Sequence, residues 1–273
     1  MCYHGECMDS VLSLIILAIV QGVTEFLPIS SSAHLVLAGE LLGSDAHHSG
    51  IAIILHGATL TAVIAYFRKD IYRLMRAIFS RTPSKDRSMA GAVLLGTLPI
   101  ALVGFFVYPV LSVVRTLPSV ALALVVSGVL LILADYSIRK RWIITDIPLW
   151  RKGIAIGLIQ IGALLPGVSR SGVTIAGGRL FGFSRREATR FSFLLAIPAI
   201  LGALVLFFIQ TPLSALSFGG TGLGTLLLVV CIAGAVSYIT IHYFLRWIER
   251  MGFVPFFVYQ VLLGVALLLV SVL

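Results

Sequence analysis

Charged residues are scarce in this 273-residue chain: they make up 11% of it, against about 25% in an average soluble domain. Hydrophobic residues make up 59%, and the mean hydropathy is +1.08. This composition excludes an ordinary soluble domain and indicates an integral membrane protein. The net charge is +9, but in a membrane protein the positions of the basic residues matter more than their sum. We therefore expect no nucleic-acid partner.

Cysteine is also rare. The three cysteines, Cys2, Cys7 and Cys231, fit neither a disulfide framework nor a cysteine-based metal site. No basic stretch precedes the first apolar run, so we expect no cleaved signal peptide.

Long apolar runs predict the fold. A spanning helix needs about 20 mostly apolar residues. Six segments meet this requirement: 50–67, 88–108, 118–135, 190–209, 222–245 and 254–272. We predict an all-α integral membrane protein in which these segments are the six spanning helices.

Two further apolar regions, 10–43 and 153–182, are interrupted by polar residues. The first breaks at LPISSSAH (27–34) and the second at PGVSRSGVT (166–174). The helical piece after each break has about eleven residues and rises about 16 Å, roughly half the hydrocarbon thickness. We therefore predict two re-entrant hairpins. Their broken backbone has to be buried in protein or line a wet cavity.

The two hairpins are similar to each other when Leu27-Pro28 is aligned with Leu165-Pro166 and Gly167 is treated as an insertion. The paired positions at the breaks are then Ser30 with Ser169, Ser31 with Arg170, and Ser32 with Ser171. This predicts two repeats, about 10–135 and about 153–272, within one membrane domain covering 1–273. Each repeat holds one hairpin and three spans, an odd number, so the repeats have opposite orientation. Inverted repeats of this kind place the ligand near the midplane, where the breaks face each other.

All but two of the 20 basic residues fall on one side of this topology, the exceptions being Arg115 and Arg170. The basic residues on the shared side lie in loop 68–87, in segment 136–152, between Arg179 and Arg190, and at Arg246 and Arg250. The positive-inside rule makes this side cytoplasmic, so both termini and the first hairpin open outward. An alternative topology counts 10–27 and 153–169 as full spans, but Arg170 and the Pro-Gly pair argue against it.

The polar residues at the breaks are suited to binding an anion. New half-helices begin at about 33 and 172 in this prediction, and free N–H groups at such ends bind phosphate. Gly167 lets the backbone approach a ligand closely, and Arg170 offers a planar fork to phosphate oxygens. Ser32 and Ser171 stand where N-caps are expected; capping alone is the alternative role for them. The other hydroxyl donors at the breaks are Ser30, Ser31, Ser169 and Thr174.

Glu25 is the only acidic residue beside either break. Gln21 lies four residues earlier, on the same helix face. A carboxylate beside an amide oxygen can hold a hard divalent cation, with phosphate oxygens completing its shell. If the hairpins meet tip to tip, Glu25 and Arg170 share one small polar cavity. A purely structural ion pair is the alternative.

Three histidines fall in the apolar regions. His34 lies one turn beyond Ser30 and could donate or accept a proton. His56 and His242 lie in spanning segments without comparable neighbours, and we expect them to be structural.

The two breaks carry a resemblance to a known family. QGVTEFLPISSSAH (21–34) fits a Glu/Gln-x-x-x-Glu pattern followed by a serine run and a histidine, and PGVSRSGVT (166–174) fits Pro-Gly-x-Ser-Arg-Ser-x-x-Thr. With these motifs the chain, over 8–273, resembles the bacterial undecaprenyl-diphosphate phosphatases of the bacitracin-resistance type.

The resemblance implies hydrolysis of a C55 isoprenoid diphosphate to the monophosphate, with a divalent cation, Mg²⁺ or Ca²⁺. This reaction recycles the lipid carrier for cell-wall glycan synthesis. It also implies a multi-pass protein of the bacterial inner (plasma) membrane and resistance to bacitracin, which competes for the same lipid. A homodimer is left open.

Carried over by motif, the central residues would be Glu25, Ser31, His34 and Arg170, surrounded by Gln21, Ser30, Ser169 and Thr174. We favour Ser31 as nucleophile with His34 as general base, and attack by water stays open because it uses the same residues. A mechanism that needs two carboxylates is in doubt because this chain has Gln21. A lipid flippase or transporter is the alternative function, since inverted repeats with broken helices are a transporter architecture.

Overall fold

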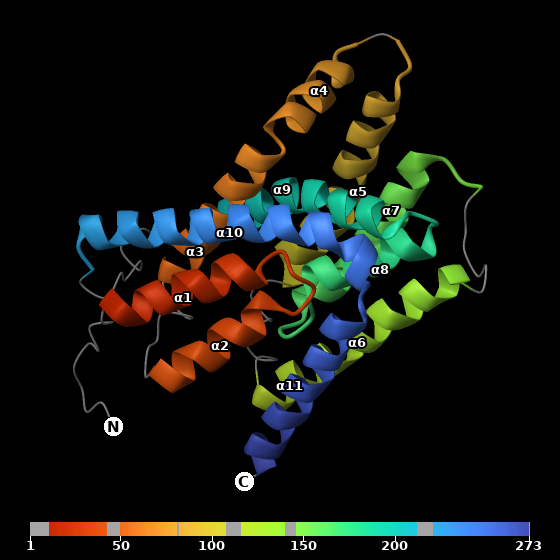
Figure 1. Cartoon of the computed structure of the whole chain (residues 1–273). Coiled ribbons are helices and arrows are strands. Elements are labelled where there is room, and N and C mark those ends of the chain that lie inside the picture. Colours follow the sequence, from red (N-terminus) through yellow and green to blue (C-terminus); the bar gives the residue numbers. More distant parts are fainter. Residues whose placement is uncertain are drawn as a thin grey trace.

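The computed structural model describes residues 11–42, 50–80, 82–107, 116–139, 146–211 and 221–272. All regular structure within these ranges is helical, with eleven α-helices and the short 3₁₀ helix η3 (Figure 1). The helices are α1 (Val11–Thr24), α2 (Ser31–Leu42), α3 (Gly50–Tyr66), α4 (Arg68–Ile78), α5 (Lys85–Val107), α6 (Leu117–Arg139), α7 (Leu149–Gln160), η3 (Ile161–Leu164), α8 (Arg170–Leu180), α9 (Arg185–Gln210), α10 (Leu223–Met251) and α11 (Val254–Val272). The extreme termini and Arg115, which entered the predicted topology, lie outside the described residues.

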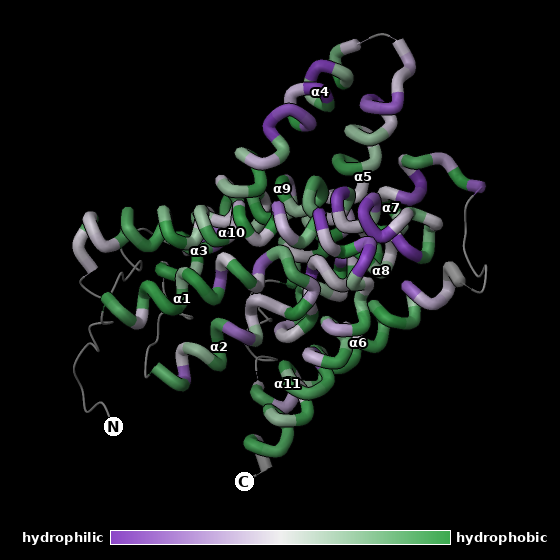
Figure 2. The backbone as a smooth tube through the Cα atoms, in the orientation of Figure 1, coloured by the Kyte–Doolittle hydropathy of each residue, from purple (hydrophilic) through white to green (hydrophobic). Residues whose placement is uncertain are grey.

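Five helices, α5, α6, α9, α10 and α11, are long and apolar enough to cross a bilayer. They confirm five of the six predicted spans. The sixth segment, 50–67, forms α3, which ends after 17 residues and so rises only about 25 Å. It reaches the length of a span only together with α4, from which it is bent by 77°. In Figure 2, α4 and the adjoining start of α5 carry many hydrophilic residues, whereas α6 and α11 are mainly hydrophobic.

Each of the two interrupted regions forms a pair of short helices around its break. The pieces after the breaks, α2 and α8, have 12 and 11 residues, in agreement with the predicted length. In the first region the chain reverses between α1 and α2, which lie side by side (Figure 1). In the second, η3 continues α7 before the break, and α7 packs against α8. None of these helices is long enough to span a bilayer alone.

Glycines allow the first and second halves of the chain to pack closely. A Cβ on Gly157 of α7 would lie 2.1 Å from the carbonyl oxygen of Gly96 of α5. A Cβ on Gly22 of α1 would lie 2.9 Å from the carbonyl oxygen of Ala233 of α10. Small residues permit such close approach of membrane helices. Helices α3 and α9 add to the same arrangement, since α3 packs on α10 and α9 packs on α5.

A buried ion-pair cluster joins α6, α8 and α9. Asp135 accepts hydrogen bonds from Nε of Arg179 at 2.9 Å and from Nη2 of Arg185 at 2.6 Å. Arg179 also donates to the carbonyl of Phe183 at 2.7 Å. A buried carboxylate needs such partners, because an unpaired charge in this environment is very costly. The cluster fixes the C-terminal end of α8, whose N-terminal end forms part of the site described next.

Candidate active site

The two breaks in the chain meet at one point. Proline accounts for each interruption, because Pro28 and Pro166 lack an N–H and disfavour helical backbone before them. Ser30 then has a φ of +68° and Gly167 a φ of +93°. At Gly167 a Cβ would lie 2.3 Å from the carbonyl oxygen of Val120, so only glycine fits. At Ser30 this conformation costs on the order of 1–3 kcal/mol, and strain of this kind gathers at functional sites.

The half-helices begin two residues earlier than predicted, at Ser31 and Arg170. The N-cap of α8 is Ser169, whose hydroxyl accepts a hydrogen bond from the backbone N–H of Gly172 at 3.1 Å. Ser30 is placed in the same way before α2 and accepts from the backbone N–H of Ala33 at 3.4 Å. The assignment of Ser32 and Ser171 as N-caps was therefore wrong. Runs of serine offer several cap candidates, and the backbone conformation decides among them.

Ser32 and Ser171 instead bind each break to the other. The hydroxyl of Ser171 donates to the carbonyl of Leu27 at 2.9 Å. The hydroxyl of Ser32 accepts from the backbone N–H of Gly167 at 3.4 Å. Each of the two serines also lies 3.2 Å from the capping serine of its own helix, oxygen to oxygen. Serines at matched positions of the two breaks thus each contact the opposite break, one as donor to a carbonyl and the other as acceptor from an N–H.

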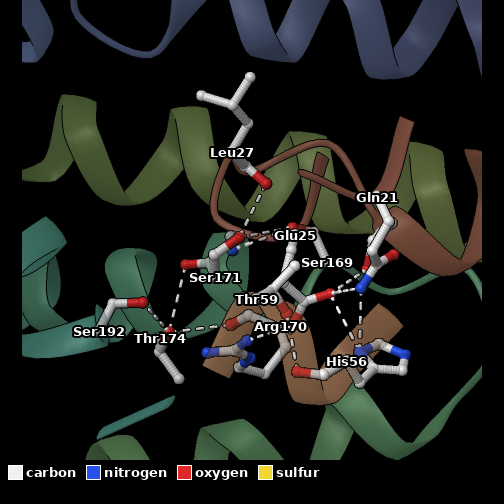
Figure 3. A network of polar contacts seen from close by, with 12 residues as sticks. Gln21, Glu25, Leu27, His56, Thr59, Ser169, Arg170, Ser171, Thr174 and Ser192 are labelled. Atoms are coloured by element: carbon white, nitrogen blue, oxygen red, sulfur yellow. Dashed lines mark hydrogen bonds and ion pairs between the residues drawn. The ribbon is translucent and has the colours of Figure 1, made fainter. Parts of the chain in front are cut away.

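Glu25 is the centre of the polar network at this junction (Figure 3). Its Oε1 accepts from Nη2 of Arg170 at 2.7 Å. Its Oε2 accepts from Oγ of Ser31 and from Nε2 of Gln21, both at 2.8 Å. The side chain of Glu25 is 5% exposed and that of Arg170 15% exposed. The structure therefore brings together four of the residues predicted from the motifs.

Two buried polar atoms beside Glu25 have no hydrogen-bond partner among the described residues. They are Nη1 of Arg170, a charged donor, and Oε1 of Gln21, an acceptor. Buried polar groups are nearly always paired, so each exception calls for an explanation. Nη1 is suited to an anionic oxygen, and Oε1 is suited to a cation or a hydrogen-bond donor.

His56 of α3 is a site residue that the sequence analysis missed. Its Nδ1 lies 3.3 Å from Oε2 of Glu25 and 3.1 Å from Nε2 of Gln21. The expectation that His56 has no comparable neighbours was wrong, because α3 packs against α1 and presents this histidine to the break. An ionisable residue within an apolar segment was the available signal.

His34 is directed elsewhere. Its Nδ1 lies 2.7 Å from the carbonyl oxygen of Ser30 and its Nε2 lies 2.6 Å from the hydroxyl of Tyr259. The two rings are stacked, with centroids 5.5 Å apart. A carbonyl only accepts, so Nδ1 carries a proton, and in the neutral imidazole Nε2 accepts from the hydroxyl of Tyr259. Both ring nitrogens are thereby engaged, and the hydroxyl of Ser31 points to Glu25 instead of His34.

One cavity of about 250 Å³ gathers most of these groups. Its polar lining consists of Glu25, Ser31, Ser32, His56, Ser169, Arg170 and Ser171, and its other walls are apolar residues of α3, α5, α9 and the segment 163–168.

The other predicted site residues, Gln21, Ser30, His34, Gly167 and Thr174, are not among the cavity-lining residues. They support those that are. Thr174, for example, donates to the carbonyl of Arg170 at 2.9 Å and lies 2.7 Å from the hydroxyl of Ser192.

The protein groups around the cavity offer few ligands to a metal. Within the described parts of the chain, no three His, Cys, Asp or Glu side chains gather into a cluster that could hold an ion. The oxygen atoms available near one another here are the carboxylate of Glu25, Oγ of Ser31 at 2.8 Å from it, and the unpaired Oε1 of Gln21, whose Nε2 faces Glu25. They suit a hard divalent cation that takes its remaining ligands from a phosphate or from water.

Known proteins with similar sequences identify the family. A family model described as bacitracin resistance protein BacA matches residues 14–266. The chain belongs to the BacA family. Undecaprenyl-diphosphatase 1 of Pseudoalteromonas translucida (strain TAC 125) is 38% identical over 264 residues, which cover 95% of this chain and 98% of the relative.

Undecaprenyl-diphosphatase of Thioalkalivibrio sulfidiphilus (strain HL-EbGR7) is also 38% identical, over 262 residues that cover 93% of this chain and 96% of the relative. The family resemblance that the sequence motifs at the two breaks indicated is thus confirmed over nearly the whole chain.

Proposed function

We propose that this BacA-family enzyme hydrolyses undecaprenyl diphosphate to undecaprenyl phosphate and inorganic phosphate. The names of both relatives support this substrate. The observation that carries the proposal is the contact of Arg170 with Glu25, at which a cationic fork, a carboxylate and two serines meet between apolar helices. A diphosphate attached to a hydrocarbon tail needs an anion site of this kind beside apolar surface.

In this proposal, the phosphate groups of the substrate bind where the two chain breaks meet. Nη1 of Arg170 has no protein partner among the described residues and is free to donate to a phosphate oxygen. Helices α2 and α8 both begin at the cavity, with Ser31 and Arg170 as their first residues. Their N-terminal N–H groups and dipoles favour the same negative charge.

Ser31 is the nucleophile that the geometry supports best. Its hydroxyl donates to Glu25 at 2.8 Å, so Glu25 is placed to accept the proton as Oγ attacks the terminal phosphorus. The bond between that phosphorus and the bridging oxygen breaks, and undecaprenyl phosphate leaves. Water then hydrolyses the phosphoserine. His56, 3.3 Å from the same carboxylate oxygen, is placed to relay the proton.

This assignment differs from the pairing of Ser31 with His34 that the sequence favoured. His34 acts by position: its bond to the carbonyl of Ser30 stabilises the strained turn that aims Ser31. Direct attack by water, with Glu25 as base, is the second route and is distinguished by whether a phosphoserine forms.

A divalent cation, Mg²⁺ or Ca²⁺, fits beside Glu25. Glu25 would hold it, and Oε1 of Gln21 would join once the amide turns so that this oxygen replaces Nε2 beside Glu25. When bound, the cation would offset the charge of the diphosphate. Gln21 supplies an amide oxygen where a second carboxylate would bind more strongly, so the diphosphate oxygens are needed to complete the site.

The fold is an inverted repeat with two re-entrant hairpins in this proposal. Two observations support the repeat. Serines at matched positions each contact the opposite break, and α5 of the first repeat packs on α7 of the second while α10 of the second packs on α1 of the first. With the basic α4 on the cytoplasmic side of the bacterial inner membrane, the Glu25 hairpin opens outward. Hydrolysis there returns the lipid carrier to cell-wall glycan synthesis and removes the diphosphate that bacitracin competes for.

A lipid flippase is the second candidate, favoured by two broken helices that meet. Purified protein in detergent, incubated with undecaprenyl diphosphate and Mg²⁺, separates the two functions. We expect phosphate release from the wild type and none above background from Glu25→Ala. If the wild type releases no phosphate, the hydrolase assignment fails and lipid movement in vesicles becomes the property to measure.

A further inference from the structure

A second cavity, of about 270 Å³, lies beside the active-site cavity between α5 and α9. Its lining residues are Thr97, Ile100, Ala101, Gly104, Phe105, Leu164, Pro198, Ala199, Gly202, Ala203, Val205, Leu206 and Ile209. Four of them also line the active-site cavity: Ile100, Leu164, Ala199 and Ala203. The two cavities therefore share a wall, with Arg170 and Glu25 on one side of it only.

The lining of this second cavity is apolar. Thr97 is its one hydroxyl residue, and that hydroxyl donates to the carbonyl of Val93 at 2.9 Å. The outer residues Phe105, Val205 and Ile209 are 53%, 51% and 71% exposed, as expected of side chains that face lipid. The cavity thus offers an apolar path from the polar junction towards the bilayer.

We propose that this cavity binds the isoprenoid tail of the substrate next to the diphosphate, a subsite that rests on the proposed function. When the diphosphate is held at Arg170, the first carbons of the tail must contact apolar side chains. Ile100, Leu164 and Ala203, which line both cavities, provide these contacts where one cavity adjoins the other. The stretch of α5 from Thr97 to Phe105 is about 12 Å long. It accommodates the first few isoprene units, and the rest of the tail lies in the bilayer.

Glycine provides the room for the tail. A Cβ on Gly202 of α9 would meet no heavy atom within 4 Å, and one on Gly104 of α5 would meet only Leu164, at an ordinary 3.5 Å. The first carbon of a side chain at Gly202, a residue that lines the cavity, therefore has open space around it. Gly202 lies within the helix α9, and leucine favours a helix more than glycine does, so the substitution should not weaken α9.

Gly202→Leu tests the subsite through the length of the substrate tail. We would measure kcat/KM in detergent for farnesyl diphosphate, which has three isoprene units, and for isopentenyl diphosphate, which has one. The substitution should lower the ratio of farnesyl to isopentenyl values roughly tenfold, because several methylene groups lose their apolar contacts. Gly224→Leu is the matched control: Gly224 of α10 also has nothing within 4 Å, lines neither cavity, and its substitution should leave the ratio unchanged within about twofold.

An unchanged ratio for Gly202→Leu, or an equal loss with both substrates, would overturn the subsite. A farnesyl diphosphate analogue with a benzophenone at the tail end gives an independent measurement, since ultraviolet light should crosslink it to α5 or α9 in the wild type and less so in Gly202→Leu. Crosslinking without hydrolysis of either substrate would support the subsite and refute the proposed function. Hydrolysis with crosslinks confined to other helices would do the reverse.

Discussion

Glu25 and Arg170 are 145 residues apart in the sequence, yet Oε1 of the carboxylate lies 2.7 Å from Nη2 of the guanidinium. Their contact joins the break after α1 to the break before α8. Around it, matched serines cross from one break to the other. Two halves of the chain thus build one site that neither half contains alone.

Arg170 should be essential for turnover. If it holds phosphate charge that grows in the transition state, Arg170→Ala should lower kcat about 10²–10³-fold. Arg170→Lys should also be poor, because a point charge cannot replace a planar fork that binds Glu25 and phosphate together. Arg73→Ala, at an arginine of α4 whose side chain is 57% exposed, is the control and should keep its activity. Near-normal turnover by Arg170→Lys would refute recognition through the fork.

The Glu25–Arg170 pair should also contribute to stability. Glu25→Gln leaves a buried guanidinium without its carboxylate, which we expect to cost about 3–5 kcal/mol and to lower the thermal unfolding midpoint in detergent. Replacing both residues, as Glu25→Gln with Arg170→Met, removes the unpaired charge and should restore much of that stability without restoring activity. If the losses in the double variant simply add, the two residues are not coupled.

The main elements of the fold could be predicted from the sequence because their causes are local. Apolar runs predict the spanning helices, and Pro28 and Pro166 predict the breaks. The bend between α3 and α4 was not apparent from the sequence. The apolar run 50–67 continues past Tyr66, where α3 ends, and gives no sign of the sharp turn before α4 begins at Arg68.

The site could be predicted only in part. Glu25 and Arg170 are the ionisable residues beside the breaks, and this rarity made them recognisable. The roles of the histidines depend on how helices pack: α3 brings His56 to Glu25, and α11 brings Tyr259 to His34. Sequence spacing contains no information about such contacts between distant helices. The proximity of His34 to Ser31 along the chain therefore did not reveal that the hydroxyl of Ser31 contacts Glu25.

His56 should matter for the rate. His56→Ala removes the group beside Oε2 of Glu25 and should lower kcat by about tenfold to a hundredfold. The upper end of this range is the smallest effect typical of general acid–base catalysis. His56→Asn, whose amide can replace the Nδ1 contact with Gln21, should recover part of the loss if the histidine acts by position. His242→Ala is the control, because His242 of α10 packs against Tyr66 and lines neither site cavity. Wild-type turnover by His56→Ala would remove this residue from the mechanism.

Removing divalent cations should abolish activity, and adding Mg²⁺ or Ca²⁺ should restore it. The residue that distinguishes cation binding from a general salt effect is Gln21. Gln21→Glu supplies a second carboxylate beside Glu25 and should lower the half-saturating cation concentration several-fold, since affinity for hard cations rises with ligand charge. Gln21→Ala should raise it. A titration midpoint that is the same in all three proteins would show that the cation does not bind between Gln21 and Glu25.

The central claim is that the phosphorus–oxygen bond is cleaved where the two breaks meet, with Ser31 as the attacking group. Rapid-quench analysis of a single turnover, with ³²P on the terminal phosphorus of undecaprenyl diphosphate, tests it most directly. Label should appear on the protein before free phosphate does, mass spectrometry should locate it on Ser31, and Ser31→Ala should form neither phosphoprotein nor phosphate at an appreciable rate. Label on another residue, or phosphate release by Ser31→Ala at the wild-type rate, would contradict the claim.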